Sequence, residues 1–164
     1  MTKKQLQDKI KSIKALVMDV DGVLTDGGMY YSETGDEVKK FNTKDAQGIE
    51  LLMKKGFLVA IITKEKTQIV ERRARKMKVA DLFQGVENKL IVLKEYASTN
   101  HTALDQIAYI GDDINDLSIL REVGLPIAVR DAISDVKEVA QYVTKARGGA
   151  GAVREVCDLF LRNE

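Results

Sequence analysis

The chain has 164 residues, of which 45% are hydrophobic, and its formal net charge at pH 7 is +1. This length suits a single domain over residues 1–164, and the apolar fraction is enough for a sizeable core. A net charge this close to zero argues against a nucleic acid or a membrane surface as the main partner. No apolar segment of the sequence is long enough to cross a bilayer.

The single cysteine, Cys157, cannot form an internal disulfide and indicates a reducing compartment, so we expect a cytoplasmic protein. We expect Cys157 itself to be a small core residue of the last helix. The single histidine, His101, stands in a polar stretch that predicts a solvated loop. Histidine-based catalysis is therefore not expected.

Helical and strand-like segments alternate along the chain. The pattern predicts helices over 3–12, 45–55, 67–78, 89–97 and 115–123, and a last helix that follows a Gly-Gly pair and ends near 161. It predicts buried strands over 15–18, 58–62, 82–83, 107–110 and 127–129, and a β-hairpin over 29–41. Asp45 is expected to cap the second helix and Gly56 to end it. The fold class that follows is α/β, a Rossmann-like doubly wound parallel sheet with a hairpin insert.

Two carboxylates, Asp19 and Asp21, follow the first strand directly. A buried strand should not end in two acids without a cation to meet them, because unpaired buried charge is costly. A magnesium ion together with a phosphate group would meet that need, and an ordinary polar turn is the simpler alternative. A calcium loop is excluded, because its fifth, sixth and twelfth positions would be Val23, Leu24 and Tyr30.

Further polar side chains stand where other predicted strands end or a helix begins, namely Thr63, Lys89, Asp112 and Asp113. Ligands of doubly wound folds bind beyond the carboxyl ends of the strands, so these side chains are expected at one site. Taken singly, Thr63 could be a helix cap and Lys89 a surface lysine. As an ordered set after the acidic pair, they resemble the four motifs of the haloacid dehalogenase superfamily of phosphotransferases.

This resemblance implies a chemical role for four residues. Asp19 would attack phosphorus and form an aspartyl-phosphate. Asp21 would protonate the leaving group and then activate water. Thr63 would hydrogen-bond a phosphoryl oxygen, and Lys89 would supply positive charge to it.

The same resemblance implies a magnesium site. Its ligands would be Asp19, the Asp21 carbonyl and Asp112, with Asp113 and Asp116 at or close to these ligands. Mg²⁺ is a hard cation that prefers such oxygen ligands and keeps several waters.

A narrower resemblance rests on the spacing of the motifs, because the gaps between them leave no room for a cap domain. The runs at 21–27, 40–42 and 148–155 resemble the capless sugar-acid phosphatases. This implies a Mg²⁺-dependent phosphomonoesterase whose substrate is a small-molecule sugar-acid phosphate, either an eight-carbon 2-keto-3-deoxy acid or a nine-carbon acid of the sialic-acid type. It also implies a homotetramer in which a neighbour covers each site.

One run departs from the eight-carbon enzymes. Those enzymes usually place Gly-Arg after the motif threonine, whereas residues 63–67 read Thr-Lys-Glu-Lys-Thr, which matches the nine-carbon relatives except at Lys64. Glu65 would hydrogen-bond sugar hydroxyls or an amine, where an arginine would favour a carboxylate. This departure leaves the identity of the sugar acid open, but it does not change the expected reaction.

Two elements could complete the site from a neighbouring subunit. The hairpin carries Tyr30, Tyr31 and Phe41, more aromatic surface than a free hairpin should expose, so we expect hairpins to pair across subunits. The glycine-rich tail at 148–151 leads to Arg154, whose guanidinium could bind a substrate carboxylate in cis or in trans. The alternative is that Arg154 lies on a solvated helix face.

Two other functions stay open. A phospho-aspartate signalling switch of the receiver type combines similar residues, but a second acid at Asp21 favours turnover over storage of the phosphoryl group. A non-catalytic regulatory domain of the same superfamily is the other alternative, and the intact motifs argue against it.

Overall fold

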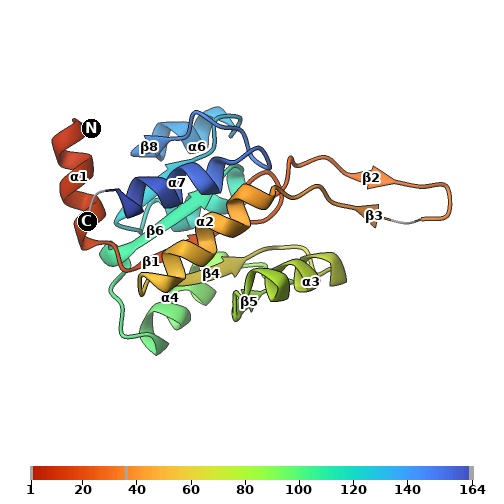
Figure 1. Cartoon of the computed structure of the whole chain (residues 1–164), viewed down its shortest axis with the longest axis horizontal. Helices are drawn as coiled ribbons and strands as arrows, with labels where there is room; N and C mark the ends of the chain where they lie inside the picture. Colours follow the sequence, from red (N-terminus) through yellow and green to blue (C-terminus); the bar gives the residue numbers. More distant parts are fainter. Residues whose placement is uncertain (1, 36, 163–164) are drawn as a thin grey trace.

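The computed structural model of the protein describes residues 2–35 and 37–162. At its centre lies a parallel sheet of six strands in the order β5-β4-β1-β6-β7-β8 (Figure 1). The strands are β1 (Ala15–Met18), β4 (Leu58–Ile62), β5 (Asp81–Phe83), β6 (Ile107–Gly111), β7 (Leu125–Ala128) and β8 (Tyr142–Val143). The helices are α1 (Lys3–Ser12), α2 (Thr43–Lys54), α3 (Gln68–Met77), α4 (Lys89–Thr99), α5 (Leu117–Leu120), α6 (Ser134–Val139) and α7 (Ala152–Leu161).

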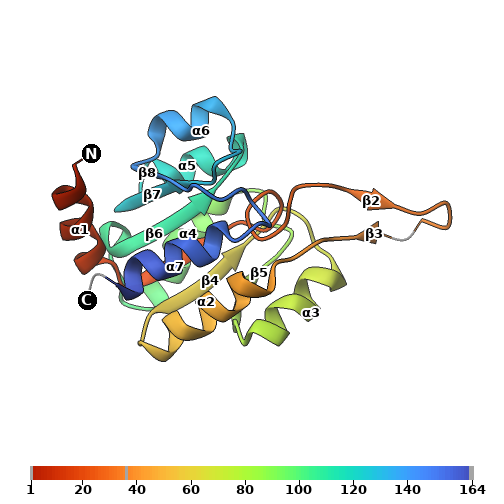
Figure 2. The same cartoon turned by 45° about the horizontal axis from the view of Figure 1, so that its top comes forward.

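Helices cover both faces of the sheet, so the predicted doubly wound α/β class is confirmed. On one face α2 packs against both α3 and α7, and on the other α5 packs between α4 and α6 (Figure 2). α7 returns to lie along α2, and Val156, Cys157 and Phe160 face the core. Cys157 is therefore a buried core residue, as predicted.

The central strands bring three chain segments to one edge of the sheet. β1 and β6 are buried along their whole length, which is why both are continuous apolar runs in the sequence. Met18 pairs with Ile61 on one side and with Ile110 on the other. The residues that directly follow β1, β4 and β6 therefore lie next to one another.

The predicted hairpin is present, with shorter strands than expected. β2 (Tyr30–Tyr31) and β3 (Glu37–Val38) form a separate antiparallel pair that projects away from the sheet (Figure 1). A bridge between Thr25 and Phe41 closes the base of the hairpin. The hairpin is thereby attached to the loop that follows β1.

Several predicted boundaries were wrong. Asn42, not Asp45, caps α2, because its side chain accepts the backbone N–H of Lys44 and leaves Asp45 buried inside the first turn. The helix expected over 115–123 is a 3₁₀ turn, η2 (Ile114–Asp116), followed by the short α5. The pattern also missed α6 and β8, since six and two residues are too few to establish a period.

No helix in the described part of the chain is both long and apolar enough to span a membrane.

Candidate active site

The carboxyl ends of β1, β4 and β6 surround a cavity of about 290 Å³. Its lining includes five acidic side chains and one hydroxyl, those of Asp19, Asp21, Glu65, Asp112, Asp113 and Thr63. The structure thus gathers most of the residues that the sequence singled out. Lys89 lies against Asp19, while Arg154 lies elsewhere.

The loop after β1 is a tight turn that places Asp19 and Asp21 at this edge. The Val20 carbonyl accepts the backbone N–H groups of Leu24 at 2.9 Å and Thr25 at 3.0 Å. Gly22 has a φ of +82°, and a Cβ there would overlap the carboxylate of Asp112. Glycine is therefore required at this position both for the backbone conformation and for the close approach of two loops.

Lys89 at the start of α4 provides the countercharge for Asp19. Its amino group lies 2.7 Å from Asp19 Oδ2 and 2.8 Å from Asp116 Oδ1, and the side chain is 1% exposed. Asn88 caps the helix and so fixes the point from which Lys89 enters the site. A buried lysine held by two carboxylates is a built part of the site, unlike the surface lysine considered as the alternative.

Asp116 is held by a network that the sequence analysis did not find. The hydroxyl of Tyr109, a fully buried residue of β6, donates to Asp116 Oδ1 at 2.7 Å. The backbone N–H of Asp112 donates to Asp116 Oδ2 at 2.9 Å. A tyrosine within an otherwise apolar predicted strand was the only available signal, because a buried hydroxyl needs a partner.

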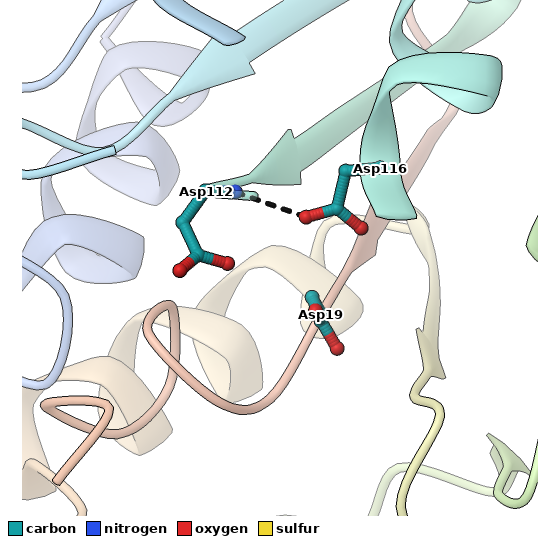
Figure 3. Close-up of side chains that lie close together, drawn as sticks. All are labelled: Asp19, Asp112 and Asp116. Atoms are coloured by element: carbon teal, nitrogen blue, oxygen red, sulfur yellow. Dashed lines mark hydrogen bonds between the residues drawn. The ribbon is translucent and has the colours of Figure 1, made fainter. Parts of the chain in front are cut away.

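Three carboxylates, those of Asp19, Asp112 and Asp116, form a group that fits a divalent cation (Figure 3). Each offers one oxygen, and these oxygens lie within 4.8 Å of one another. Burial, followed by the charges of Asp116 and Asp19, raises the pKa of Asp112 to about 8. Asp112 Oδ1 is buried without a hydrogen-bond partner among the described residues. Like charges gathered out of water favour the binding of such a cation, so the residues fit Mg²⁺.

The Asp21 side chain lies in a different polar cluster, formed with the hairpin. Its Oδ1 is 2.6 Å from the amino group of Lys39, which is also 2.7 Å from Glu65 Oε2. Burial lowers the pKa of Lys39, but the hydrogen bonds with Asp21 and Glu65 outweigh it, and the net shift is upward. Sequence reasoning missed Lys39, because nothing in the hairpin pattern distinguished it from Lys40.

Of the two other residues predicted to bind substrate, Thr63 lies in the cavity and Arg154 does not. Thr63 is buried at the end of β4 and lines the cavity. Arg154 instead pairs with Asp158 through a 2.8 Å contact and lines a separate cavity of about 460 Å³ beside α7. The tail before α7 does reach the loop after β1, since the N–H of Gly149 donates to the Val23 carbonyl at 3.0 Å.

Comparisons with known proteins agree with this geometry. The family model of haloacid dehalogenase-like hydrolases matches residues 54–155. The 3-deoxy-D-manno-octulosonate 8-phosphate phosphatase of Yersinia pestis is 43% identical over 150 residues, which cover 92% of this chain and 80% of that protein. The corresponding enzyme of Escherichia coli K12 is 43% identical over 153 residues, which cover 93% of this chain and 81% of the E. coli enzyme.

A solved structure matches across nearly the whole fold. It is the 3-deoxy-D-manno-octulosonate 8-phosphate phosphatase of Moraxella catarrhalis in complex with magnesium, phosphate and KDO. Its TM-score is 0.96 at 38% identity, with 99% of this chain and 94% of that chain covered. The parallel sheet, the capless architecture and the acidic cavity are thus those of a haloacid dehalogenase-like hydrolase. Within that class, the chain belongs to the family of the 3-deoxy-D-manno-octulosonate 8-phosphate phosphatases.

Proposed function

We propose that the chain hydrolyses the phosphate monoester of a 2-keto-3-deoxy sugar acid through an aspartyl-phosphate on Asp19. The observation that carries this proposal is the position of Asp19, at the end of the central strand, 2.7 Å from Lys89 and in one cavity with Asp112. The names of the related enzymes from Y. pestis and E. coli support the choice of substrate.

The reaction has two halves. In the first, a carboxylate oxygen of Asp19 bonds to phosphorus, the bond from phosphorus to the sugar oxygen breaks, and the Asp21 carboxyl gives its proton to that oxygen. In the second, Asp21 takes a proton from water, the water oxygen bonds to phosphorus, and the bond to Asp19 breaks. Inorganic phosphate leaves, and both side chains return to their starting state.

The remaining residues bind the phosphoryl group and offset its charge. Thr63 would donate a hydrogen bond to a phosphoryl oxygen, and Lys89 would neutralise part of the negative charge. Both Asp116 oxygens already accept hydrogen bonds, from Lys89, Tyr109 and the Asp112 N–H. Mg²⁺ would therefore be held by Asp19, Asp112 and the Asp21 carbonyl, and it would supply further positive charge to the phosphoryl oxygens.

Glu65 bears on which sugar acid is the substrate. It lines the cavity at the place where the eight-carbon enzymes usually carry an arginine. Its Oε2 is paired with Lys39, and its other oxygen is able to accept hydrogen bonds from hydroxyl or amine groups, whereas an arginine there would favour a carboxylate. We therefore propose a preference that includes nine-carbon acid phosphates as well as KDO 8-phosphate.

Assembly and location complete the proposal. We propose a homotetramer acting as a one-domain enzyme in the cytoplasm, where a buried free Cys157 would stay reduced. Because Arg154 lies outside the Asp19 cavity of its own chain, its contact with a substrate carboxylate would be made in a neighbouring subunit. An Arg154→Met variant should then raise KM for a sugar-acid phosphate and leave KM for an aryl phosphate unchanged.

The test is a phosphate-release assay with a panel of eight- and nine-carbon sugar-acid phosphates, compared by kcat/KM. Turnover should stop in EDTA and return with Mg²⁺, while Ca²⁺ should support it poorly because its looser geometry misplaces the attack. Asp19→Asn should abolish turnover. Full activity of that variant, or full activity in chelator, would refute the proposal, and absence of turnover in the wild type would favour a switch or a regulatory domain.

A further inference from the structure

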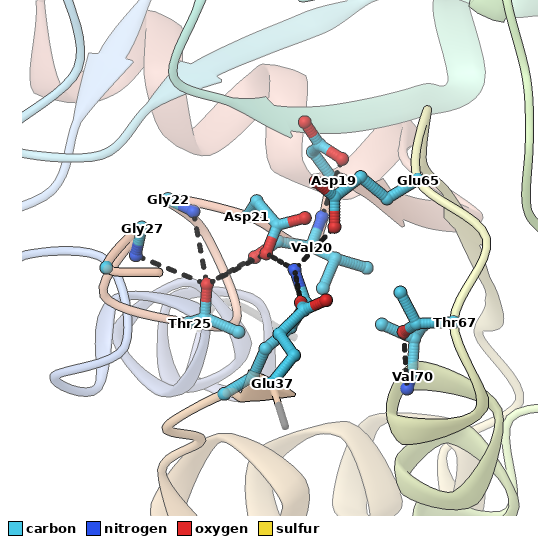
Figure 4. Close-up of polar contacts among 12 residues, drawn as sticks. Asp19, Val20, Asp21, Gly22, Thr25, Gly27, Glu37, Glu65, Thr67 and Val70 are labelled. Atoms are coloured by element: carbon cyan, nitrogen blue, oxygen red, sulfur yellow. Dashed lines mark hydrogen bonds and ion pairs between the residues drawn. The ribbon is translucent and has the colours of Figure 1, made fainter. Parts of the chain in front are cut away.

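Lys39 is a buried cation that the catalytic motifs do not include. It follows β3 in the hairpin, its side chain is 0% exposed, and its amino group meets three carboxylates. The distances are 2.6 Å to Asp21, 2.7 Å to Glu65 and 3.3 Å to Glu37. Figure 4 shows these three acids converging from the loop after β1, the loop after β4 and the hairpin.

The neighbouring lysine shows that this arrangement is specific to one position. The side chain of Lys40 is 64% exposed, and its amino group lies 3.5 Å from a carboxylate oxygen of Asp26. Lys39 instead loses its water and side-chain freedom, a cost that only close charge-assisted hydrogen bonds offset. The chain therefore holds this one amino group against Asp21.

The contacts restrain the Asp21 carboxyl group. Its Oδ1 is the acceptor for Lys39, and the hydroxyl of Thr25 lies 3.4 Å from the same oxygen. Thr25 in turn is bridged to Phe41 at the base of the hairpin. Proton transfer requires the carboxyl to stand within hydrogen-bond reach of the leaving oxygen, so a group that fixes its rotation acts on that step.

We propose that Lys39 is the positioning residue of Asp21, holding its carboxyl group in the orientation from which it protonates the leaving oxygen. This inference rests on the proposed function, in which Asp21 is the acid and base. Lys39 acts through Asp21 and makes no contact with substrate in this role. Because Lys39 belongs to the hairpin and also binds Glu65, the hairpin links the acid to the loop that faces the sugar.

The leaving group provides a readout that a merely structural role would not change. A sugar or alkyl alkoxide must be protonated as it departs, whereas nitrophenolate departs without a proton. A misplaced acid therefore slows phosphates with poor leaving groups and spares those with good ones. Substrates without a carboxylate also remove any direct contact between Lys39 and a sugar acid.

The experiment measures log kcat/KM against leaving-group pKa for a series of carboxylate-free aryl and alkyl phosphates. Lys39→Met should lower kcat/KM for the alkyl phosphates by about 10–100-fold, which is less than the full effect of losing a general acid. It should leave kcat/KM for the nitrophenyl phosphates nearly unchanged. Asp21→Asn should give a steeper slope still. Lys39→Arg, which keeps the charge, should restore much of the wild-type slope, and Lys40→Met is the matched control with no change.

An equal loss along the whole series, or an unchanged slope, would overturn the role of Lys39. If Asp21→Asn itself left the slope unchanged, the assignment of Asp21 would fail, and the inference with it. Circular dichroism and thermal melting establish that each variant is folded. Should Lys39→Met fail to fold, Lys39→Gln keeps a polar tip without the charge and is expected to steepen the slope in the same direction.

Discussion

At the scale of single residues, the site consists of charges that are buried in contact with one another. Lys89 lies between Asp19 and Asp116, and Asp116 also accepts hydrogen bonds from Tyr109 and from the backbone of Asp112. Removing one member leaves the others with uncompensated buried charge, which costs more than the intact pair contributes. Stability and catalysis therefore depend on the same side chains.

Lys89→Met tests this dependence. Without metal, the carboxylates of Asp19 and Asp116 would lose their common countercharge, and the free energy of unfolding should fall by about 3–5 kcal/mol. With Mg²⁺, kcat should fall by about 10²–10³-fold, the usual cost of losing one charge-stabilising donor. Urea denaturation and steady-state kinetics measure the two effects. Lys94→Met, on the exposed side of the same helix, is the control, and a Lys89→Met enzyme with normal kcat would contradict the prediction.

Asp45 predicts a pH dependence of stability away from the active site. Burial raises the pKa of this 1% exposed carboxyl from 3.8 to about 6, although the Arg154 N–H and the charge of Arg73 oppose the shift. The folded chain therefore holds the proton more tightly than the unfolded chain. The stability that Asp45 contributes is fully present below pH 3.8 and is lost as the pH rises through about 6.

Asp45→Asn should remove this loss. The difference in unfolding free energy between the variant and the wild type should move in favour of the variant by about 1–3 kcal/mol from pH 4 to pH 7. Urea denaturation at several pH values measures it, with Asp8→Asn, an exposed acid of α1, as the control. If the difference in unfolding free energy stayed constant from pH 4 to pH 7, folding would not raise the pKa of Asp45.

At the scale of elements, the active site depends on two loops that approach each other more closely than side chains would allow. A Cβ on Gly22 would overlap the Asp112 carboxylate, and Gly149 lies against the backbone of Thr25 and Asp26 in the same way. The loop after β1 is thus packed between the loop after β6 and the tail before α7.

Gly22→Ala should weaken metal binding. Its φ of +82° would cost about 1–2 kcal/mol for an alanine, and the added methyl group would displace the Asp112 carboxylate. Calorimetric titration should show Mg²⁺ affinity reduced by about 10–100-fold, as for other changes next to metal ligands. Gly56→Ala is the matched control, because φ there is +88° with no atom within 4 Å, so it should lose stability but keep Mg²⁺ affinity. Equal Mg²⁺ affinity in both variants would contradict the assignment of the metal site.

The elements that could be predicted from the sequence are those with a continuous apolar run that ends in polar residues. β1, β4 and β6 were predicted because buried parallel strands are continuous apolar runs, and Asp19, Thr63 and Asp112 follow from the rule that ligands bind at strand ends. The side chains that Lys39 and Tyr109 contact could not be predicted. These partners lie 18 and 7 residues away, and only the packing of the hairpin and of β6 brings them together.

The sequence also left the position of Arg154 open. A glycine-rich tail before a helix is compatible with docking on either the same chain or a neighbour, and local pattern does not choose between them. The structure has Arg154 paired with Asp158 one turn further along α7, with its side chain 31% exposed. Removal of the whole tail from residue 147 would be a poor test, because α7 buries Val156 and Phe160 in the core.

At the scale of the whole molecule, apolar surface is concentrated on the hairpin. The exposed fractions are 67% for Tyr31 and 59% for Val38, which is paired with Tyr30, in a hairpin that projects from the sheet (Figure 1). A two-stranded hairpin is marginally stable by itself, and exposed aromatic surface of this kind favours burial against another copy. The cavity beside the base of the hairpin would be covered by the same contact.

Replacing Tyr31 by Ser and Val38 by Thr should therefore convert the proposed tetramer into smaller species. Sedimentation velocity at assay concentration measures the change. KM for the sugar-acid phosphate should rise by about tenfold, equivalent to one good polar contact from a neighbour, while KM for p-nitrophenyl phosphate should stay the same. Ile91→Thr is the matched control, because Ile91 is 54% exposed on α4, outside the hairpin, and should leave the assembly intact. A wild-type chain that sediments as a fully active monomer would refute this arrangement, and equal disruption by the control would show that the hairpin is not the interface.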